Sequence, residues 1–227
     1  MGYNKVTLQS GYNLLGNNWN LVGGEDGLIT DVLDATAVSG LDDNGDFTSQ
    51  IQLWSGSGYS IYGWSGYLGD DAESAPYNYK WLNKSTLEPV NIDAPKGTAF
   101  WIKTASPSSV VFSGEVASED TLTASVSAGY NLLANPFPET ISIQQIQSED
   151  LSGLDDNGDF TSQIQLWTGS GYTIYGWSGY LGDDAESAPY NYKWLNKSTL
   201  EPATENLEIG KGFWIQTGSS ATIKFTK

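Results

Sequence analysis

The chain has 227 residues, of which 27 are acidic and 10 are basic, and its net charge of −17 opposes binding to nucleic acid and to anionic lipid surfaces. It contains neither Cys nor His, which excludes disulfides and thiolate metal sites and removes the usual general base near neutral pH. No segment approaches the roughly 20 consecutive apolar residues that a membrane-spanning helix needs. We therefore expect a protein that is not an enzyme, does not insert into a membrane and has no nucleic acid partner.

The first half of the chain predicts a series of short strands. Residues 5–9 alternate polar and apolar side chains, so Val6 and Leu8 are expected to face a core. Further strands are expected at residues 12–15, 50–54, 59–64, 77–82, 99–104 and 109–112, and a short helical turn is expected within residues 141–147. About seven strands of this kind separated by Gly-rich turns predict an all-β fold, a β-sandwich or a barrel-like unit.

An internal repeat divides the chain. Residues 39–89 recur as residues 152–202 with 49 of 51 positions identical and an offset of 113. The flanks are more diverged, and residues 11–15 recur as residues 129–133 at an offset of 118. We predict two tandem homologous units, residues 1–115 and residues 116–227. Either recombination that copied one block over the other or a binding surface shared by both blocks explains the uneven identity.

The segment from residue 50 to residue 64 predicts a hairpin with an exposed aromatic face. Gly56-Ser57-Gly58 suits a three-residue loop, which would place Ile51, Leu53, Tyr59 and Ile61 on the core face. Flat aromatic rings stack on sugars, and side-chain amides form hydrogen bonds with sugar hydroxyl groups, so we predict that the opposite face binds a ligand. The predicted ligand-binding residues are Trp54, Tyr62, Trp64 and Gln52 and their counterparts Trp167, Tyr175, Trp177 and Gln165. The alternative is burial of these rings against another sheet or the second unit. The following rings, Tyr77, Tyr79 and Trp81, are expected in the core.

Two acidic loops resemble part of a calcium-binding loop. Oxygen-bearing side chains alternate in residues 42–46 and 155–159, a spacing that lets a tight loop surround a hard cation. The predicted calcium ligands are Asp42, Asn44, Asp46, Asp155, Asn157 and Asp159. Phe47 and Leu53 stand where a calcium loop has Gly and Glu, and a turn closed by Asp and Asn side chains is the alternative. Calcium is the one cofactor that the sequence suggests.

Carboxylates are the remaining candidates for catalysis. Asp70, Asp71 and Glu73 share one loop and recur as Asp183, Asp184 and Glu186. A pair of carboxylates is how most glycoside hydrolases act, so a hydrolase is a third hypothesis. However, none of these groups has an apolar sequence environment that would raise its pKa, and a solvated acidic loop is the preferred explanation.

Three motifs of the second half resemble a repeated β unit of large secreted bacterial surface proteins. They are residues 129–138 (GYNLLANPFP), residues 164–175 (IQLWTGSGYTIY) and residues 210–215 (GKGFWI). Residues 16–20 (GNNWN) of the first half lack the two prolines of the first motif. The resemblance implies a secreted or cell-surface location and a non-catalytic accessory role, and it assigns no ligand. Residues 1–8 lack the basic and apolar regions of a signal peptide, so we expect any export signal to lie outside this sequence.

Together these features predict a binding or adhesion module whose partner is a glycan or a cell-surface protein. A structural spacer of a surface protein is the alternative, in which the rings fill the contact between units and bind no ligand.

Overall fold

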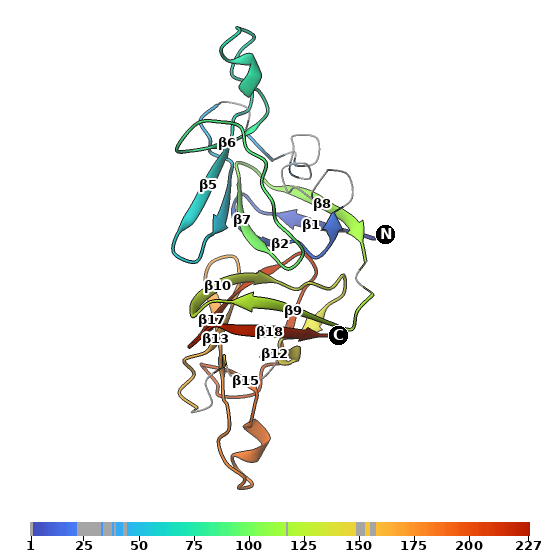
Figure 1. Cartoon of the computed structure of the whole chain (residues 1–227), viewed down its shortest axis with the longest axis vertical. Helices are drawn as coiled ribbons and strands as arrows, with labels where there is room; N and C mark the ends of the chain where they lie inside the picture. The colour runs from blue at the N-terminus through green and yellow to red at the C-terminus, as the bar shows by residue number, and fades with distance from the viewer. Residues whose placement is uncertain are drawn as a thin grey trace.

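The computed structural model describes residues 2–21, 33, 38, 40–42, 45–116, 118–148, 153–154 and 158–227. The described residues form an all-β molecule with three short 3-10 turns and without an α-helix. Figure 1 shows an elongated body whose two ends are loops and whose chain termini lie on the same side. The all-β fold class expected from the sequence is therefore confirmed.

The first half of the chain contributes two antiparallel sheets. The larger has five strands in the order β2-β7-β4-β5-β6, with bounds Gly11–Gly16, Ala99–Thr104, Gln50–Trp54, Tyr59–Trp64 and Trp81–Asn83. The smaller has the order β1-β8-β3, with bounds Gly2–Leu8, Ser108–Glu115 and Asn20–Leu21. The 3-10 turn η1 (Ala75–Tyr77) lies in the connection from β5 to β6.

The second half repeats this arrangement. Its five-stranded sheet has the order β10-β17-β13-β14-β15, with bounds Gly129–Ala134, Gly212–Thr217, Gln163–Trp167, Tyr172–Trp177 and Trp194–Asn196. Its three-stranded sheet has the order β12-β18-β9, with bounds Ile146–Ser148, Ala221–Thr226 and Thr121–Val126. The pair β11-β16 (Ile141–Ser142 and Asn206–Leu207) and the turns η2 (Ile143–Gln145) and η3 (Ala188–Tyr190) complete it.

We call β1–β8 unit one and β9–β18 unit two. Every sheet consists of strands from a single unit. The exact boundary after residue 115 stays a prediction.

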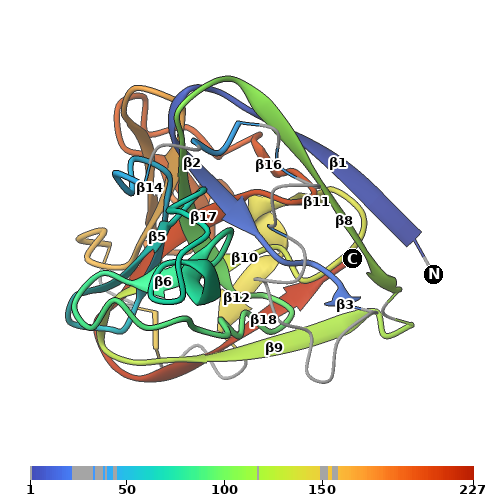
Figure 2. The ribbon, with the colours of Figure 1, turned by 90° about the horizontal axis from the view of Figure 1, so that it is seen from above.

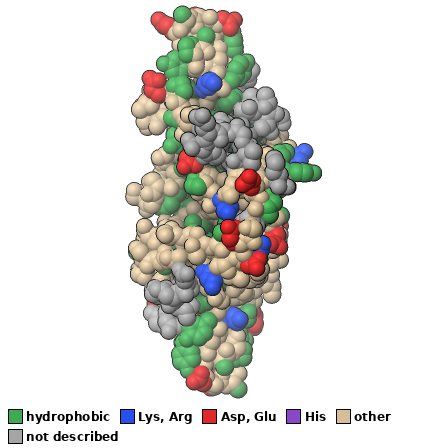
Figure 3. Space-filling model, turned by 45° about the vertical axis from the view of Figure 1, so that its right-hand side comes forward, with side chains coloured by type: hydrophobic (Ala, Val, Ile, Leu, Met, Phe, Trp, Pro, Cys, Tyr) green, Lys and Arg blue, Asp and Glu red, His purple; other side chains and the backbone are tan. Residues whose placement is uncertain are grey.

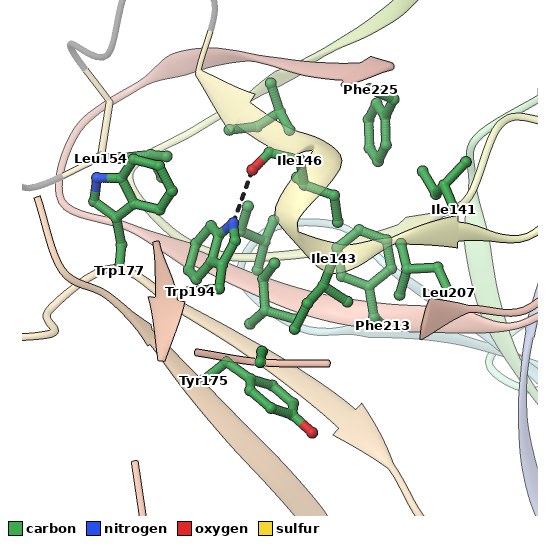
Figure 4. Packing of buried hydrophobic residues seen from close by; sticks show 14 of the residues in the cluster. Ile141, Ile143, Ile146, Leu154, Tyr175, Trp177, Trp194, Leu207, Phe213 and Phe225 are labelled. Carbon is green, nitrogen blue, oxygen red and sulfur yellow. Dashed lines mark hydrogen bonds between the residues drawn. The ribbon is translucent and has the colours of Figure 1, made fainter. Parts of the chain in front are cut away.

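Each unit is a sandwich whose core lies between its five-stranded and three-stranded sheets. In unit one the alternation along β1 buries Val6 and Leu8, as expected. In unit two the indole N–H of Trp194 donates to the carbonyl oxygen of Ile146 at 2.7 Å (Figure 4). The counterpart Trp81 donates to the carbonyl oxygen of Leu33 at 2.6 Å. A backbone carbonyl thus satisfies each indole donor that burial removes from water.

The hairpin β4–β5 has a register that differs from the predicted one. The ladder pairs Leu53 with Ser60, whereas the predicted three-residue loop would pair Leu53 with Ile61. The backbone N–H of Ser55 donates to the carbonyl oxygen of Gly58 at 2.9 Å, and Gly56 has φ +92°. The hairpin is therefore closed by a two-residue turn whose first residue is Gly56. A shift of one residue turns every side chain of β5 to the other face.

Because of this shift, four of the eight predicted ligand-binding residues face the core and not the solvent. Trp64, Tyr175 and Trp177 are only 3%, 1% and 1% exposed, and Tyr62 packs against the core of unit one. Conversely, Tyr59 and Ile61, which were expected in the core, are exposed. The prediction that Tyr62, Trp64, Tyr175 and Trp177 face outward is therefore wrong. Leu53 is on the predicted face and partly buried against the core.

The two units meet through the outer faces of their five-stranded sheets. Trp54 contacts Trp214 with ring centroids 5.3 Å apart, and the counterpart pair of Trp167 and Trp101 has the same separation. Exchanging every residue for its counterpart maps one contact onto the other, so the units are related by an approximate two-fold axis. Strands β2, β10 and β17 of this contact lie near the centre when the molecule is viewed along its length (Figure 2).

Backbone hydrogen bonds follow the same approximate symmetry. The N–H of Gly16 donates to the carbonyl oxygen of Gly210 at 3.0 Å, and the N–H of Ala134 donates to the carbonyl oxygen of Gly97 at 2.8 Å. A Cβ atom on Gly16 would lie 2.3 Å from the Cβ of Ala134, its own counterpart. The two units can therefore approach this closely only because one of the two facing residues is Gly.

The hairpin register predicts different costs for two isoleucines on adjacent strands. Ile51 is 0% exposed, so Ile51→Ala should lower the free energy of unfolding by about 2–5 kcal/mol. Ile61 is 37% exposed, so Ile61→Ala should cost less than about 1 kcal/mol. Chemical denaturation of both variants measures the difference. Equal costs would contradict the two-residue turn.

Candidate functional site

The remaining predicted ligand-binding residues lie at the contact between the units. Trp54 and Trp167 pack into the cluster that joins the two five-stranded sheets, and the indole N–H of Trp54 donates to the carbonyl oxygen of Tyr130 at 2.9 Å. The side-chain amides of Gln52 and Gln165 donate to the hydroxyl groups of Tyr12 and Tyr130 at 3.2 and 3.4 Å. The eight predicted residues therefore do not form two equivalent exposed patches.

The exposed rings of the repeated block lie elsewhere, in the segment between β5 and β6 and in its counterpart. We call residues 65–80 and residues 178–193 the tip loops. They form the two opposite ends of the molecule, where hydrophobic side chains gather at the surface (Figures 1 and 3). Tyr67 and Tyr79 of the first tip are 43% and 48% exposed, and Tyr180 and Tyr192 of the second are 43% and 38% exposed.

Hydrogen bonds within each tip loop hold its shape. At the base of the first tip loop, the backbone N–H of Ser65 donates to the carbonyl oxygen of Lys80 at 3.0 Å. The backbone N–H of Tyr79 donates to the carbonyl oxygen of Gly66 at 2.8 Å. The Asn78 side chain spans the loop, accepting from the N–H of Leu68 and donating to the carbonyl oxygen of Gly69, both at 2.7 Å. The turn η1 buries no residue. An ordered loop that contributes no buried hydrophobic side chain is typical of a functional loop.

Tyr79 and Tyr192 adopt a backbone conformation that is unfavourable for their side chains. Both have φ +55°, in the left-handed region that costs a residue with a Cβ atom about 1–2 kcal/mol. This residue interrupts the strand expected at residues 77–82, so β6 begins only at Trp81 and the ring of Tyr79 points to the surface. The expectation that Tyr79 joins Trp81 in the core is wrong, and Tyr77 is half-buried. Gly would adopt this conformation at lower cost.

Each tip places two tyrosine rings beside carboxylates. The Tyr67 and Tyr79 centroids are 6.3 Å apart with ring planes 34° apart, and Tyr180 and Tyr192 repeat these values. The hydroxyl group of Tyr67 donates a hydrogen bond to the Asp70 carboxylate, and this bond raises the pKa of the phenol. The Asp71 carboxylate accepts hydrogen bonds from the backbone N–H groups of Ser74 and Glu73 at 2.9 and 3.0 Å. These bonds lower the pKa of Asp71. The tip thus combines aromatic faces with fixed hydrogen-bond acceptors.

The predicted calcium loops are only partly described. Asp42, Asp46 and Asp159 are described, whereas Asn44, Asp155 and Asn157 lie outside the described residues. The Asp42 carboxylate accepts the N–H of Thr48 at 3.1 Å, and Asp46 accepts the same N–H at 2.8 Å. Burial, followed by hydrogen bonding to the neighbouring Asp46 carboxylate, raises the pKa of Asp42. Among the described residues no group of three acidic side chains is arranged to hold a metal ion. Calcium binding stays a prediction.

The tip hydrogen bond gives a titration test. Asp70→Asn removes the charge that disfavours the Tyr67 phenolate, so the pKa of Tyr67 should fall toward its ordinary value. Ultraviolet difference spectroscopy should show one tyrosine of the variant ionising at lower pH than in the wild type. Glu73→Gln is the control, because it removes a carboxylate from the same loop without removing this hydrogen bond. Superimposable titration curves for Asp70→Asn and the wild type would contradict the contact.

Calcium should raise the melting temperature if the acidic loops bind it, because a ligand of the folded state stabilises that state. The rise should diminish as the pH falls through the raised pKa of Asp42, since the protonated carboxyl no longer attracts the cation. The double substitution Asp42→Asn/Asp155→Asn should abolish the rise. Identical melting curves in calcium and in chelator would remove the metal hypothesis.

No family model, curated protein or solved structure matches the chain. The resemblance to repeated units of surface proteins therefore stays a prediction. Of the helical segments in the described part of the chain, none has the length and apolar character needed to cross a membrane.

Proposed function

We propose that the protein is a secreted or cell-surface, non-catalytic adhesion module that bridges two glycan-bearing partners through its tip loops. The observation that carries this proposal is the presence of matching exposed tyrosine pairs at opposite ends of an elongated molecule. The tips replace the hairpin faces as the duplicated aromatic patches.

The chemistry of the tips favours a sugar ligand. The rings of Tyr67 and Tyr79 supply flat apolar surface for stacking on a sugar ring, and the carboxylates of Asp70 and Asp71 beside them accept hydrogen bonds from sugar hydroxyls. A partner that is anionic throughout is disfavoured by the net charge of −17. Each tip has a small, water-exposed contact surface, so we expect weak binding at a single tip.

The position of the tips favours bridging over binding of both tips to one short ligand. They lie at opposite ends of the long axis (Figure 1), so a short glycan that occupies one tip does not reach the other. Two surfaces or two polymers that carry the same glycan are instead joined by one molecule. Many such bridges acting together would give strong adhesion from weak individual contacts.

The state of the tip carboxylates supports a non-catalytic role. A general acid of a glycoside hydrolase has a raised pKa, which keeps it protonated until it transfers its proton. Asp71 and its counterpart Asp184 instead have lowered pKa values, because backbone N–H groups stabilise their ionised forms. These groups are suited to accept hydrogen bonds and are poor proton donors.

A structural spacer is the second candidate. The packing of Trp54 and Trp167 between the units favours it, because a spacer needs its aromatic residues to fix the angle between neighbours. A spacer does not account for the exposed rings of Tyr79 and Tyr192 in a costly backbone conformation.

Agglutination of polysaccharide-coated beads distinguishes these functions. Across a polysaccharide panel, the wild type should bind and agglutinate the beads that carry its ligand. Tyr67→Ala and Tyr180→Ala should each still bind but fail to agglutinate, because one working tip cannot bridge. The double substitution Tyr67→Ala/Tyr180→Ala should agglutinate no bead and bind the beads more weakly than either single variant, and Tyr3→Ala, at an exposed ring away from the tips, should behave as wild type.

Circular dichroism and thermal melting establish that each variant is folded. A wild type that binds no bead, or a folded double variant that still agglutinates, would leave the spacer as the better account.

A further inference from the structure

A groove of about 940 Å³ lies between the two units, at the middle of the molecule and separate from the tips. Its volume is near the upper end of the range of about 300–1,000 Å³ that is typical of ligand-binding sites. Five aromatic rings and one amide dominate its lining: Tyr12, Gln52, Tyr59, Trp101, Trp167 and Tyr172. Tyr12, Gln52, Tyr59 and Trp101 come from unit one and the other two from unit two, so neither unit contains the groove alone.

The rings of the groove are exposed to a ligand and already fixed in place. Tyr12, Tyr59 and Tyr172 are 46%, 40% and 39% exposed. Tyr12 meets the edge of Trp101 with centroids 6.2 Å apart, and Tyr172 meets Trp167 with centroids 5.1 Å apart. The amide of Gln52 donates to the Tyr12 hydroxyl at 3.2 Å. Because these contacts hold the rings before binding, little ordering of the protein opposes ligand binding.

The approximate two-fold symmetry of the units breaks down at this groove. Glu208 and Lys211 line it, whereas their counterparts across the axis are Pro95 and Thr98, which carry no charge. Within the described part of the chain, the indole N–H of Trp167 has no hydrogen-bond partner, while that of Trp54 donates to Tyr130. The groove therefore offers a charged donor, a charged acceptor and an unengaged indole donor that the counterpart positions Pro95, Thr98 and Trp54 do not supply.

We infer that this groove binds a neutral oligosaccharide. Aromatic faces match the apolar faces of sugar rings, and the Lys211 ammonium, the Glu208 carboxylate and the Trp167 indole match sugar hydroxyls as donors and acceptors. Glu208 and Lys211 balance each other within the lining, and the net charge of −17 on the whole chain opposes an anionic ligand although the Lys103 ammonium lies over the Tyr12 ring. The size of the groove fits a chain of several sugars better than a single one.

The symmetry supplies a matched control for the test. Tyr12 and its counterpart Tyr130 are 46% and 44% exposed, and each meets a tryptophan edge and accepts from a glutamine amide. Tyr12 lines the groove and Tyr130 does not. Each substitution removes the same two contacts, and Tyr12→Ala in addition removes the ring beneath the Lys103 ammonium, 5.7 Å from its centroid, and a wall of the groove.

The experiment is calorimetric titration of the full chain with linear tetrasaccharides of glucose, mannose, xylose and N-acetylglucosamine, and with one tetrasaccharide of a uronic acid. At least one neutral tetrasaccharide should bind and change the tryptophan fluorescence. Tyr12→Ala should weaken this binding about tenfold, as expected for the loss of one stacking contact, while Tyr130→Ala leaves it unchanged. Lys211→Thr, which introduces the counterpart residue, should also weaken binding, and Gln52→Ala replaces Tyr12→Ala if that variant does not fold.

Binding in the groove is independent of the tips, so Tyr67→Ala/Tyr180→Ala should leave the titration unchanged. If that double variant loses tetrasaccharide binding, the sugar binds at the tips and the groove is not a site. The inference is also overturned if no neutral tetrasaccharide binds, if Tyr12→Ala and Tyr130→Ala have equal effects, or if the uronic acid tetrasaccharide binds more tightly than the neutral ones.

Discussion

The packing of indole rings between the two units determines most of what is distinctive about this molecule. Trp54 against Trp214 and Trp101 against Trp167 give the contact a tryptophan pair on each side of the approximate two-fold axis. Inter-unit backbone hydrogen bonds and the close approach of Gly16 to Ala134 fix the distance between the sheets. Because these interactions hold the units at one angle, the tip loops point in opposite directions and a groove with walls from both units exists.

The strands could be predicted from local sequence, whereas the hairpin register could not. Hydrophobic alternation and turn residues gave the bounds of β4, β5 and β7 as the structure has them. The register depended on which of Gly56 and Gly58 takes the left-handed conformation, and both suit it. It is Gly56, which has φ +92°. That single choice reversed the expected positions of Tyr62 and Trp64, because a strand has a period of two residues.

The tip and the groove were missed for two different reasons. Tyr77, Tyr79 and Trp81 alternate as in a strand, and the left-handed conformation of Tyr79 is set by the surrounding hydrogen bonds rather than by its own preference. The Gly-flanked pair of Tyr67 and Leu68, followed by an acidic run, was a usable signal of an exposed aromatic loop. The groove gave no such signal, because its walls come from distant segments that meet only when the two units pack together.

The structure also bears on why the two blocks are so alike. Sequence identity covers the fully buried Ile51 and Ile164 as strictly as the exposed Tyr79 and Tyr192. Selection for a shared binding surface acts on exposed residues and tolerates similar apolar side chains in a core, so the uniform identity favours recombination that copied the whole block. On this account, copying made the two ends alike and left the diverged flanks to differ. The ends of the molecule are therefore suited to bind the same ligand, while Glu208 and Lys211, which lie in a flank, give the central groove a character of its own.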